Sequence, residues 1–521
     1  MAGLFVLLFY SVTQKIYSVP FSYGDDYRLL VMHHPADVPQ EYIKASRGIT
    51  FDVAGSIQYD FQQGRFRPLA WVWTNIQSAV FGLNHKAFRL FNLLVLFFSV
   101  LFFYKTLLLF QVKDLVAMLS SLVFIFGKNA ETWWLLIPPA QNMGELCLIA
   151  AIFCLALCLD KIKPIYFYSG LVLLLLASFM KESFMFIAPF IVMLFAFLAK
   201  NHFNCYDRKR SILLFAVSLV PILFLAGIVM FSGKVYGYEN SSSTAEVFVY
   251  NTKQLFISLC PTIAPLSYLI HTAFKNKSLN KTLSSLLLIT AAIIISQLLL
   301  LVKIKMEDQH HYLMPVILIP LLVSGIALSR IQQLNKTVFY PLLIIYSLFL
   351  LNNMKNTFIN TTYAAIKTST FYSMLDYIKS NPAPNYIYVN NTCTNNDWLC
   401  GTSVVLQQNL QKPFHLYHLA LGCDQNQISS YEQVNQNNLA LIKPAWVLFE
   451  LPDEKNKENY PLKVKGNNIE IAFNNSEYNI EGKLYTFENY YSDIQTRDLL
   501  TFKKEAAHKK TKLTYKAIYI N

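Results

Sequence analysis

Charged residues are scarce in this chain. Only 14% of its 521 residues are Asp, Glu, Lys or Arg, whereas 54% are hydrophobic, and the mean hydropathy is +0.35. A soluble globular domain usually carries about 25% charged residues. The composition therefore excludes an ordinary soluble protein and predicts an integral membrane protein.

The sequence also lacks Cys and His residues at zinc-ligand spacing and the stripe of basic residues that is typical of nucleic-acid binding. The eight cysteines are scattered, and they form no CxxC pair or Cys/His cluster. The net charge is +13, but the basic residues lie in short groups between apolar runs rather than in one stripe. Such groups are typical of orientation in a membrane, and we expect no nucleic-acid partner.

Long apolar runs are what the sequence has in abundance. About eleven runs are long enough, or nearly so, to cross a hydrocarbon core of roughly 30 Å. The first has no basic residue before it and no small-residue cleavage site after it, so we expect an uncleaved span. The runs lie near residues 2–19, 90–110, 114–128, 143–159, 165–180, 183–199, 211–232, 254–272, 282–302, 312–329 and 337–353.

Basic residues predict the orientation of these spans in a multi-pass cell-membrane protein. They fall in alternate connections, which the positive-inside rule assigns to the cytoplasm. The remaining connections, including a first outward loop at residues 20–89, then face outward. The basic connections contain Lys105, Lys113, Lys161, Lys163, Lys200, Arg208, Lys209, Arg210, Lys275, Lys277, Lys281, Arg330 and Lys336.

The character of the chain changes after about residue 353. A helical stretch, "STFYSMLDYIKS", is followed by alternating segments such as "NYIYVNN", "AWVLFEL", "NIEIAF" and "GKLYTF", which predict strands separated by turns. We therefore expect a membrane domain at 1–353 and a soluble α/β domain at 354–521. An odd number of spans places this second domain outside the cytoplasm. It has no nucleotide-binding loop, GxSxG or HExxH motif, which favours recognition or support over chemistry.

Two carboxylates follow the first apolar run, in "YGDDY". Asp25 and Asp26 repel each other, and burying them without partners would be costly, so an aqueous, metal-bound or catalytic pair is expected. An exposed turn without a function is the alternative, since Gly-Asp is ordinary turn chemistry. Further along the same loop, Arg65 and Arg67 in "GRFRPLAWVW" can hold substrate phosphates or anionic lipid headgroups. Residues 71–83 predict an interfacial helix.

Two further polar pairs lie next to apolar runs. Lys181 and Glu182 have almost no loop around them, so the lysine can neutralise a lipid phosphate or the pair can cap a helical hairpin. His310 and His311 lie at the entry to a late span, where they can contact phosphate in a pH-dependent way or belong to a solvated loop. Glu145 falls inside a span and should face a cavity or a partner.

Five segments resemble the GT-C glycosyltransferases when they are taken in order. After the Asp25–Asp26 pair come "GRFRPLAWVW", "FGLNHKAFRLFNLLVLFF", "NAETWWLLIPPAQNMGEL", "ASFMKESFMFIAPFI" and "EDQHHYLMPVILIP". The resemblance is to the polyprenyl-phosphate-sugar-dependent type, which includes protein mannosyltransferases and their bacterial relatives, and it covers residues 20–330. It implies a polytopic α-helical GT-C-like fold.

The resemblance also implies a reaction. A sugar would move from a polyprenyl-phosphate-linked donor to a lipid, glycan or protein acceptor on the outer side of the cytoplasmic membrane. Asp25 or Asp26 would be the catalytic base, and Glu131 resembles a second carboxylate that can hold Mg²⁺ or Mn²⁺, although some such enzymes need no metal. The implied substrate-binding residues are Arg65, Arg67, Glu131, Lys181, Glu182, His310, His311 and Tyr312.

Two other classes of membrane protein remain as alternatives. An O-antigen ligase or polymerase would have many spans and outward basic residues, but its key residues usually occupy a large loop between late spans. A transporter would be expected to show more intramembrane charges and broken helices that recur in two halves. Here the first outward loop is the longest, and it carries the Asp pair.

Overall fold

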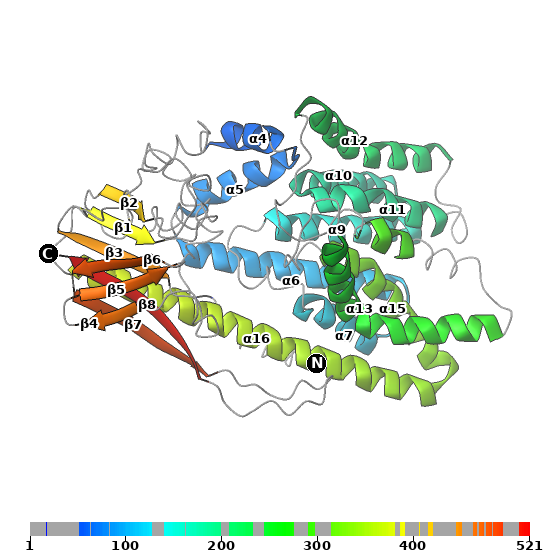
Figure 1. Cartoon of the computed structure of the whole chain (residues 1–521). Helices are drawn as coiled ribbons and strands as arrows, with labels where there is room; N and C mark the ends of the chain where they lie inside the picture. Colours follow the sequence, from blue (N-terminus) through cyan, green and yellow to red (C-terminus); the bar gives the residue numbers. More distant parts are fainter. Residues whose placement is uncertain are drawn as a thin grey trace.

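The computed structural model is mainly helical, with strands near the C-terminus (Figure 1). Bundled helices occupy one part of the molecule, and a long helix connects them to the strands. The described residues are 17, 52–62, 64–82, 84–127, 140–161, 163–198, 208–232, 244–275, 290–296, 298, 314–380, 386–390, 406, 415–419, 444–450, 462–465, 468–473, 476–481, 483–492 and 510–520.

Within the described residues, five helices are long and apolar enough to cross a membrane, which agrees with a helical membrane protein. The candidate spans are His85–Leu109, Gln141–Leu159, Ile212–Ser232, Ile317–Leu334 and Lys336–Ile359. The helices are α4 (Val53–Gln62), α5 (Pro68–Phe81), α6 (His85–Leu109), α7 (Asp114–Phe126), α9 (Ala140–Lys161), α10 (Pro164–Met180), α11 (Glu182–Leu198), α12 (Arg208–Ser232), α13 (Thr244–Lys275), α15 (Met314–Leu334) and α16 (Lys336–Ser380).

Most of the expected spans coincide with helices. The runs at 114–128, 165–180, 183–199 and 254–272 correspond to the shorter apolar helices Asp114–Phe126, Pro164–Met180, Glu182–Phe195 and Leu255–Tyr268. The runs at 2–19 and 282–302 lie largely outside the described residues. The segment expected to form an interfacial helix, residues 71–83, is helical up to Phe81 as part of α5. Pro68 stands at the start of this helix, where a missing N–H costs nothing.

Helix α9 lies inside the bundle and packs against α5, α6, α10 and α11. Close packing at two glycines brings helix backbones together. A Cβ atom at Gly170 of α10 would lie 2.9 Å from Leu155 of α9, and one at Gly325 of α15 would lie 2.9 Å from Leu107 of α6. Small residues at helix crossings are the usual means of tight packing in membranes, where the hydrophobic effect between helices is absent.

Helix α16 continues well beyond the membrane-spanning window. Its 45 residues correspond to a length of about 68 Å, so the expected domain boundary at 353/354 falls inside one continuous helix. It packs against α7, α13 and α15 and, near its end, against the strands β7 and β8.

Eight strands form two sheets. One has the order β2-β1-β3-β8-β7, with β1 parallel to β2 and β3 and with β8 antiparallel to its neighbours; the other is an antiparallel β4-β5-β6 sheet. Trp446 is buried against Tyr377 of α16, Tyr485 and Tyr519, which fixes the first sheet to the helix. The strands are β1 (Tyr386–Asn390), β2 (His415–Leu419), β3 (Ala445–Glu450), β4 (Leu462–Lys465), β5 (Asn468–Phe473), β6 (Ser476–Glu481), β7 (Lys483–Ser492) and β8 (Lys510–Ile520).

Candidate functional site

A tight turn between α4 and α5 begins the site. Gly64 has a positive φ of 70°, which favours glycine. Its N–H donates to the carbonyl of Phe61 (3.0 Å), and the N–H of Arg65 donates to the carbonyl of Asp60 (2.8 Å). This pair of bonds is the Schellman motif that ends many helices. Because Pro68 then starts α5, the three residues 65–67 are left non-helical between two fixed helix ends.

Phe66 anchors this short segment on its apolar side. Its ring stacks on those of Phe61 and Phe224, with centroids 5.9 and 5.5 Å apart, and meets Phe179 edge-on at 5.5 Å. Phe66 thus packs among aromatic rings, whereas Arg65 and Arg67 on either side of it contact carboxylates.

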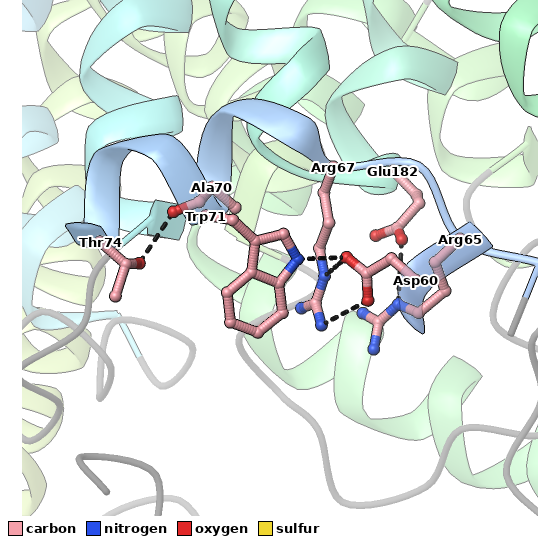
Figure 2. A network of polar contacts seen from close by, with 7 residues as sticks. All are labelled: Asp60, Arg65, Arg67, Ala70, Trp71, Thr74 and Glu182. Carbon is pink, nitrogen blue, oxygen red and sulfur yellow. Dashed lines mark hydrogen bonds and ion pairs between the residues drawn. The ribbon is translucent and has the colours of Figure 1, made fainter. Parts of the chain in front are cut away.

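Arg67 is held by Asp60 and Trp71 (Figure 2). Its Nε and Nη2 atoms donate to the two oxygens of Asp60, at 2.7 and 3.2 Å, and the indole N–H of Trp71 donates to Asp60 Oδ2 at 2.7 Å. The Arg67 guanidinium also lies 5.1 Å from the centroid of the Trp71 ring. The side chain of Asp60 is only 2% exposed, so this charge-assisted contact is well shielded from water.

Arg65 connects the turn to a distant part of the chain. Its Nε donates to Glu182 Oε1 at 3.0 Å, and the two side chains are 8% and 15% exposed. Glu182 is the first residue of α11 and directly follows Lys181, which separates α10 from α11. Arg65 therefore contacts the Lys-Glu pair, which lies more than a hundred residues further along the chain.

Lys181 extends the cluster to α9. Its ammonium group donates to Oε1 of Gln141, and Nε2 of Gln141 donates to Glu145 Oε1 at 2.9 Å. Gln141 and Glu145 are four residues apart and thus share one face of α9. All three residues are buried. The expectation that Glu145 faces a polar partner is confirmed.

A glycine permits this approach of α9 to the start of α11. A Cβ atom at Gly144 would lie 2.6 Å from the ring of Phe184 and 3.0 Å from Met180 Cβ. These two residues flank Lys181 and Glu182. The absence of a side chain at Gly144 therefore lets the Gln141–Glu145 face of α9 reach the connection between α10 and α11.

The charges of Lys181 and Glu182 respond differently to burial. Burial lowers the pKa of Lys181 well below its usual 10.5; Glu182 opposes this shift, and Arg65 and Arg67 add to it. Burial raises the pKa of Glu182, but the charges of Arg65 and Arg67 and the hydrogen bond from Arg65 outweigh it and hold that pKa at about 2. Glu182 is thus ionised at neutral pH, whereas the charged form of Lys181 is disfavoured.

The charged groups of the cluster are engaged with one another. Arg65 contacts Glu182, Arg67 contacts Asp60, and Lys181 contacts Gln141. The carboxylates of Asp60, Glu182 and Glu145 already accept hydrogen bonds from protein N–H groups. Within the described residues, no group of three or more His, Cys, Asp or Glu residues could hold a metal ion. Glu131, the residue expected to hold Mg²⁺ or Mn²⁺, lies outside the described residues.

The structure brings together five of the residues singled out from the sequence, namely Arg65, Arg67, Glu145, Lys181 and Glu182. The remaining ones lie outside the described residues: Asp25, Asp26, Glu131, His310, His311 and Tyr312.

Sequence reasoning missed Asp60 and Gln141. Asp60 stands four residues before Gly64, and a helix-ending Gly brings the chain back toward the preceding turn. That spacing is a signal that could have identified Asp60. Gln141 had no comparable local signal.

Comparison with known proteins adds no family to this description. No protein-family model matches the chain, and no curated protein matches it. The function must therefore be argued from the site itself.

Proposed function

We propose that this chain is an integral membrane glycosyltransferase that moves a sugar from a polyprenyl-phosphate-linked donor to a lipid, glycan or protein acceptor outside the cytoplasmic membrane. The observation that carries the proposal is the convergence of Arg65, Arg67 and Lys181, from segments far apart in the sequence, in one cluster in which Arg65 and Lys181 are buried and Arg67 is partly buried. In such a transfer negative charge develops on the departing phosphate, and fixed positive charge nearby stabilises it.

The ion pairs prepare the arginines for this role. Asp60 holds Arg67 through two hydrogen bonds, and Glu182 holds Arg65 through its Nε. Guanidinium groups fixed in this way require little reorganisation when an anion arrives. Lys181 is a suitable third contact, because an added negative charge would favour its protonated form.

The base that activates the acceptor would be Asp25 or Asp26. Both precede α4 in the same first outward loop that carries Arg65 and Arg67. Glu131, His310, His311 and Tyr312 are proposed to complete the donor site from other outward connections.

The proposed topology has about eleven spans and an extracytoplasmic C-terminal domain. In Figure 1 the strands lie toward the end of the bundle where α6 begins, and α5 lies at the same end. Helix α16 would then carry the strands to the side of the membrane that holds the first outward loop. A reporter fused after residue 380 should be accessible from outside the cell, and a cytoplasmic reporter would contradict this topology.

The activity is tested with Asp25→Asn and Asp26→Asn in membranes supplied with polyprenyl-phosphate sugars. We expect at least one variant to lose transfer by about a hundredfold or more, because a general base contributes on the order of 10²–10⁴ in rate. Asp114→Asn is the matched control: Asp114 begins α7, after the far end of α6. Parental transfer rates in both aspartate variants, with normal folding, would show that neither carboxylate is the base.

A further inference from the structure

An apolar groove of about 440 Å³ runs along α9 between α6 and α10. Met143, Cys147, Ala150, Cys154 and Leu157 form its floor. Their spacing of three or four residues keeps them on one face of the helix over about 21 Å. The volume falls within the range of ligand sites, about 300–1,000 Å³, and the floor residues extend along about four turns of α9.

This groove is distinct from the candidate site. At 3.6 residues per turn, Gln141 and Glu145 lie on the opposite side of α9 from the floor residues. A molecule in the groove would therefore not have its head at Lys181. The inference is independent of the proposed transferase activity.

Two exposed lysines flank one end of the groove. On α6, Lys105 lies one helical turn beyond Phe102, which lines the groove and stacks on Phe153 at 5.3 Å. On the other wall, Lys163 directly precedes α10, whose residues Ile165 and Tyr166 also line the groove. Lys105 lies near the end of α6, and Lys163 lies in the connection before α10. The positive-inside rule assigns both positions to the cytoplasmic side, where anionic lipids are enriched.

We propose that the groove binds one acyl chain of an anionic phospholipid, whose phosphate contacts Lys105 and Lys163. Three observations support this occupant. The groove lies between two candidate spans, α6 and α9, and the apolar helix α10, and its floor is apolar and extends along α9. The positive charge beside it, on Lys105 and Lys163, is confined to one end. A small soluble anion would leave the apolar floor uncovered, whereas a phospholipid matches both parts.

The test measures lipid retained by the full-length protein. The protein is purified in neutral detergent, equilibrated with phosphatidylglycerol or phosphatidylcholine, and examined by native mass spectrometry. We expect phosphatidylglycerol to be retained preferentially. The preference should fall about fivefold for each lysine removed in Lys105→Gln and Lys163→Gln. Lys336→Gln, which removes another exposed lysine from a predicted cytoplasmic connection, should leave the preference unchanged.

A substitution that fills the groove tests the acyl-chain contact separately from the contact between the phosphate and the lysines. Ala150→Phe should abolish retention of both lipids, whereas Gly227→Phe should not, because a Cβ atom at Gly227 meets nothing within 4 Å. Equal retention of the two lipids by the parent protein, or unchanged retention in Ala150→Phe, would overturn the proposal.

A second measurement needs no substitution. Phosphatidylglycerol with a photoactivatable group in its acyl chain should crosslink mainly to the Met143–Leu157 stretch of α9. The exposed face of α12, which includes Leu223 and Phe231, provides the reference for ordinary lipid contact. Crosslinks that favour α12 over α9 would refute a specific site in the groove.

Discussion

The ion pair between Asp60 and Arg67 offers a quantitative test of the cluster. In Asp60→Asn the side chain keeps its shape, and its oxygen can still accept the indole hydrogen of Trp71. The negative charge is lost, however, and the Arg67 guanidinium loses the carboxylate that it contacts at 2.7 and 3.2 Å. In Arg67→Gln the reverse occurs, and a carboxylate that is 2% exposed loses its counter-charge.

Burial sets the expected magnitudes. Removing one partner of a buried ion pair costs about 3–5 kcal/mol of the free energy of unfolding. Arg67→Gln should fall in that range, because Asp60 is almost inaccessible to water. Asp60→Asn should cost less, about 2–3 kcal/mol, because the Arg67 side chain is 15% exposed and water can partly solvate it. Arg67→Gln should therefore lower the free energy of unfolding more than Asp60→Asn does.

The assay is denaturant unfolding of the detergent-solubilised protein, applied to both single variants and to the double variant as a mutant cycle. The double variant should cost less than the sum of the single ones, with a coupling of about 2 kcal/mol. Asp114→Asn, whose carboxylate accepts only an exposed contact of 3.3 Å from Tyr104 among the contacts described, should cost about 0.5–1 kcal/mol. Additive effects within about 0.5 kcal/mol would refute the view that Asp60 and Arg67 form a coupled pair.

Three further predictions follow from the same cluster. Gly144→Ala should destabilise the protein by about 1–3 kcal/mol, because its Cβ atom would overlap Phe184, whereas Gly227→Ala should be tolerated; thermal unfolding compares them. In the unfolded chain Lys181 has its usual pKa of 10.5, whereas in the folded chain that pKa is lowered, so the unfolded chain binds the proton more tightly. The free energy of unfolding, compared with that of Lys181→Met, should therefore rise as the pH increases toward 10.5. Unfolding measurements across that pH range test this. Arg65→Lys keeps the charge but lacks the planar fork, so kcat/KM for the polyprenyl-phosphate donor should fall about tenfold; an unchanged kcat/KM would exclude a role for this guanidinium geometry.

Local sequence patterns were sufficient for most of the apolar helices and for several strands, whereas α4 and the turn after it were not predicted. Apolar runs predicted the candidate spans, and the alternation in "AWVLFEL" and "NIEIAF" predicted strands β3 and β5. Gly64 and Pro68 mark a helix end and a helix start within five residues. Each of these signals depends on neighbours along the chain, such as helical periodicity or an allowed φ angle, and such signals can be read without knowledge of the packing.

Tertiary structure alone decided which charged side chains contact one another. The sequence left Arg65 and Arg67 to phosphates or headgroups and paired Lys181 with Glu182, whereas the folded chain joins Arg67 to Asp60, Arg65 to Glu182 and Lys181 to Gln141. These contacts depend on how closely α9, α10 and α11 approach one another, which is set by side-chain volume at positions such as Gly144. The sequence by itself thus determined a helical membrane protein with charged residues beside its apolar runs. Packing determined which charges meet, because a buried charge is stable only where another element supplies its partner.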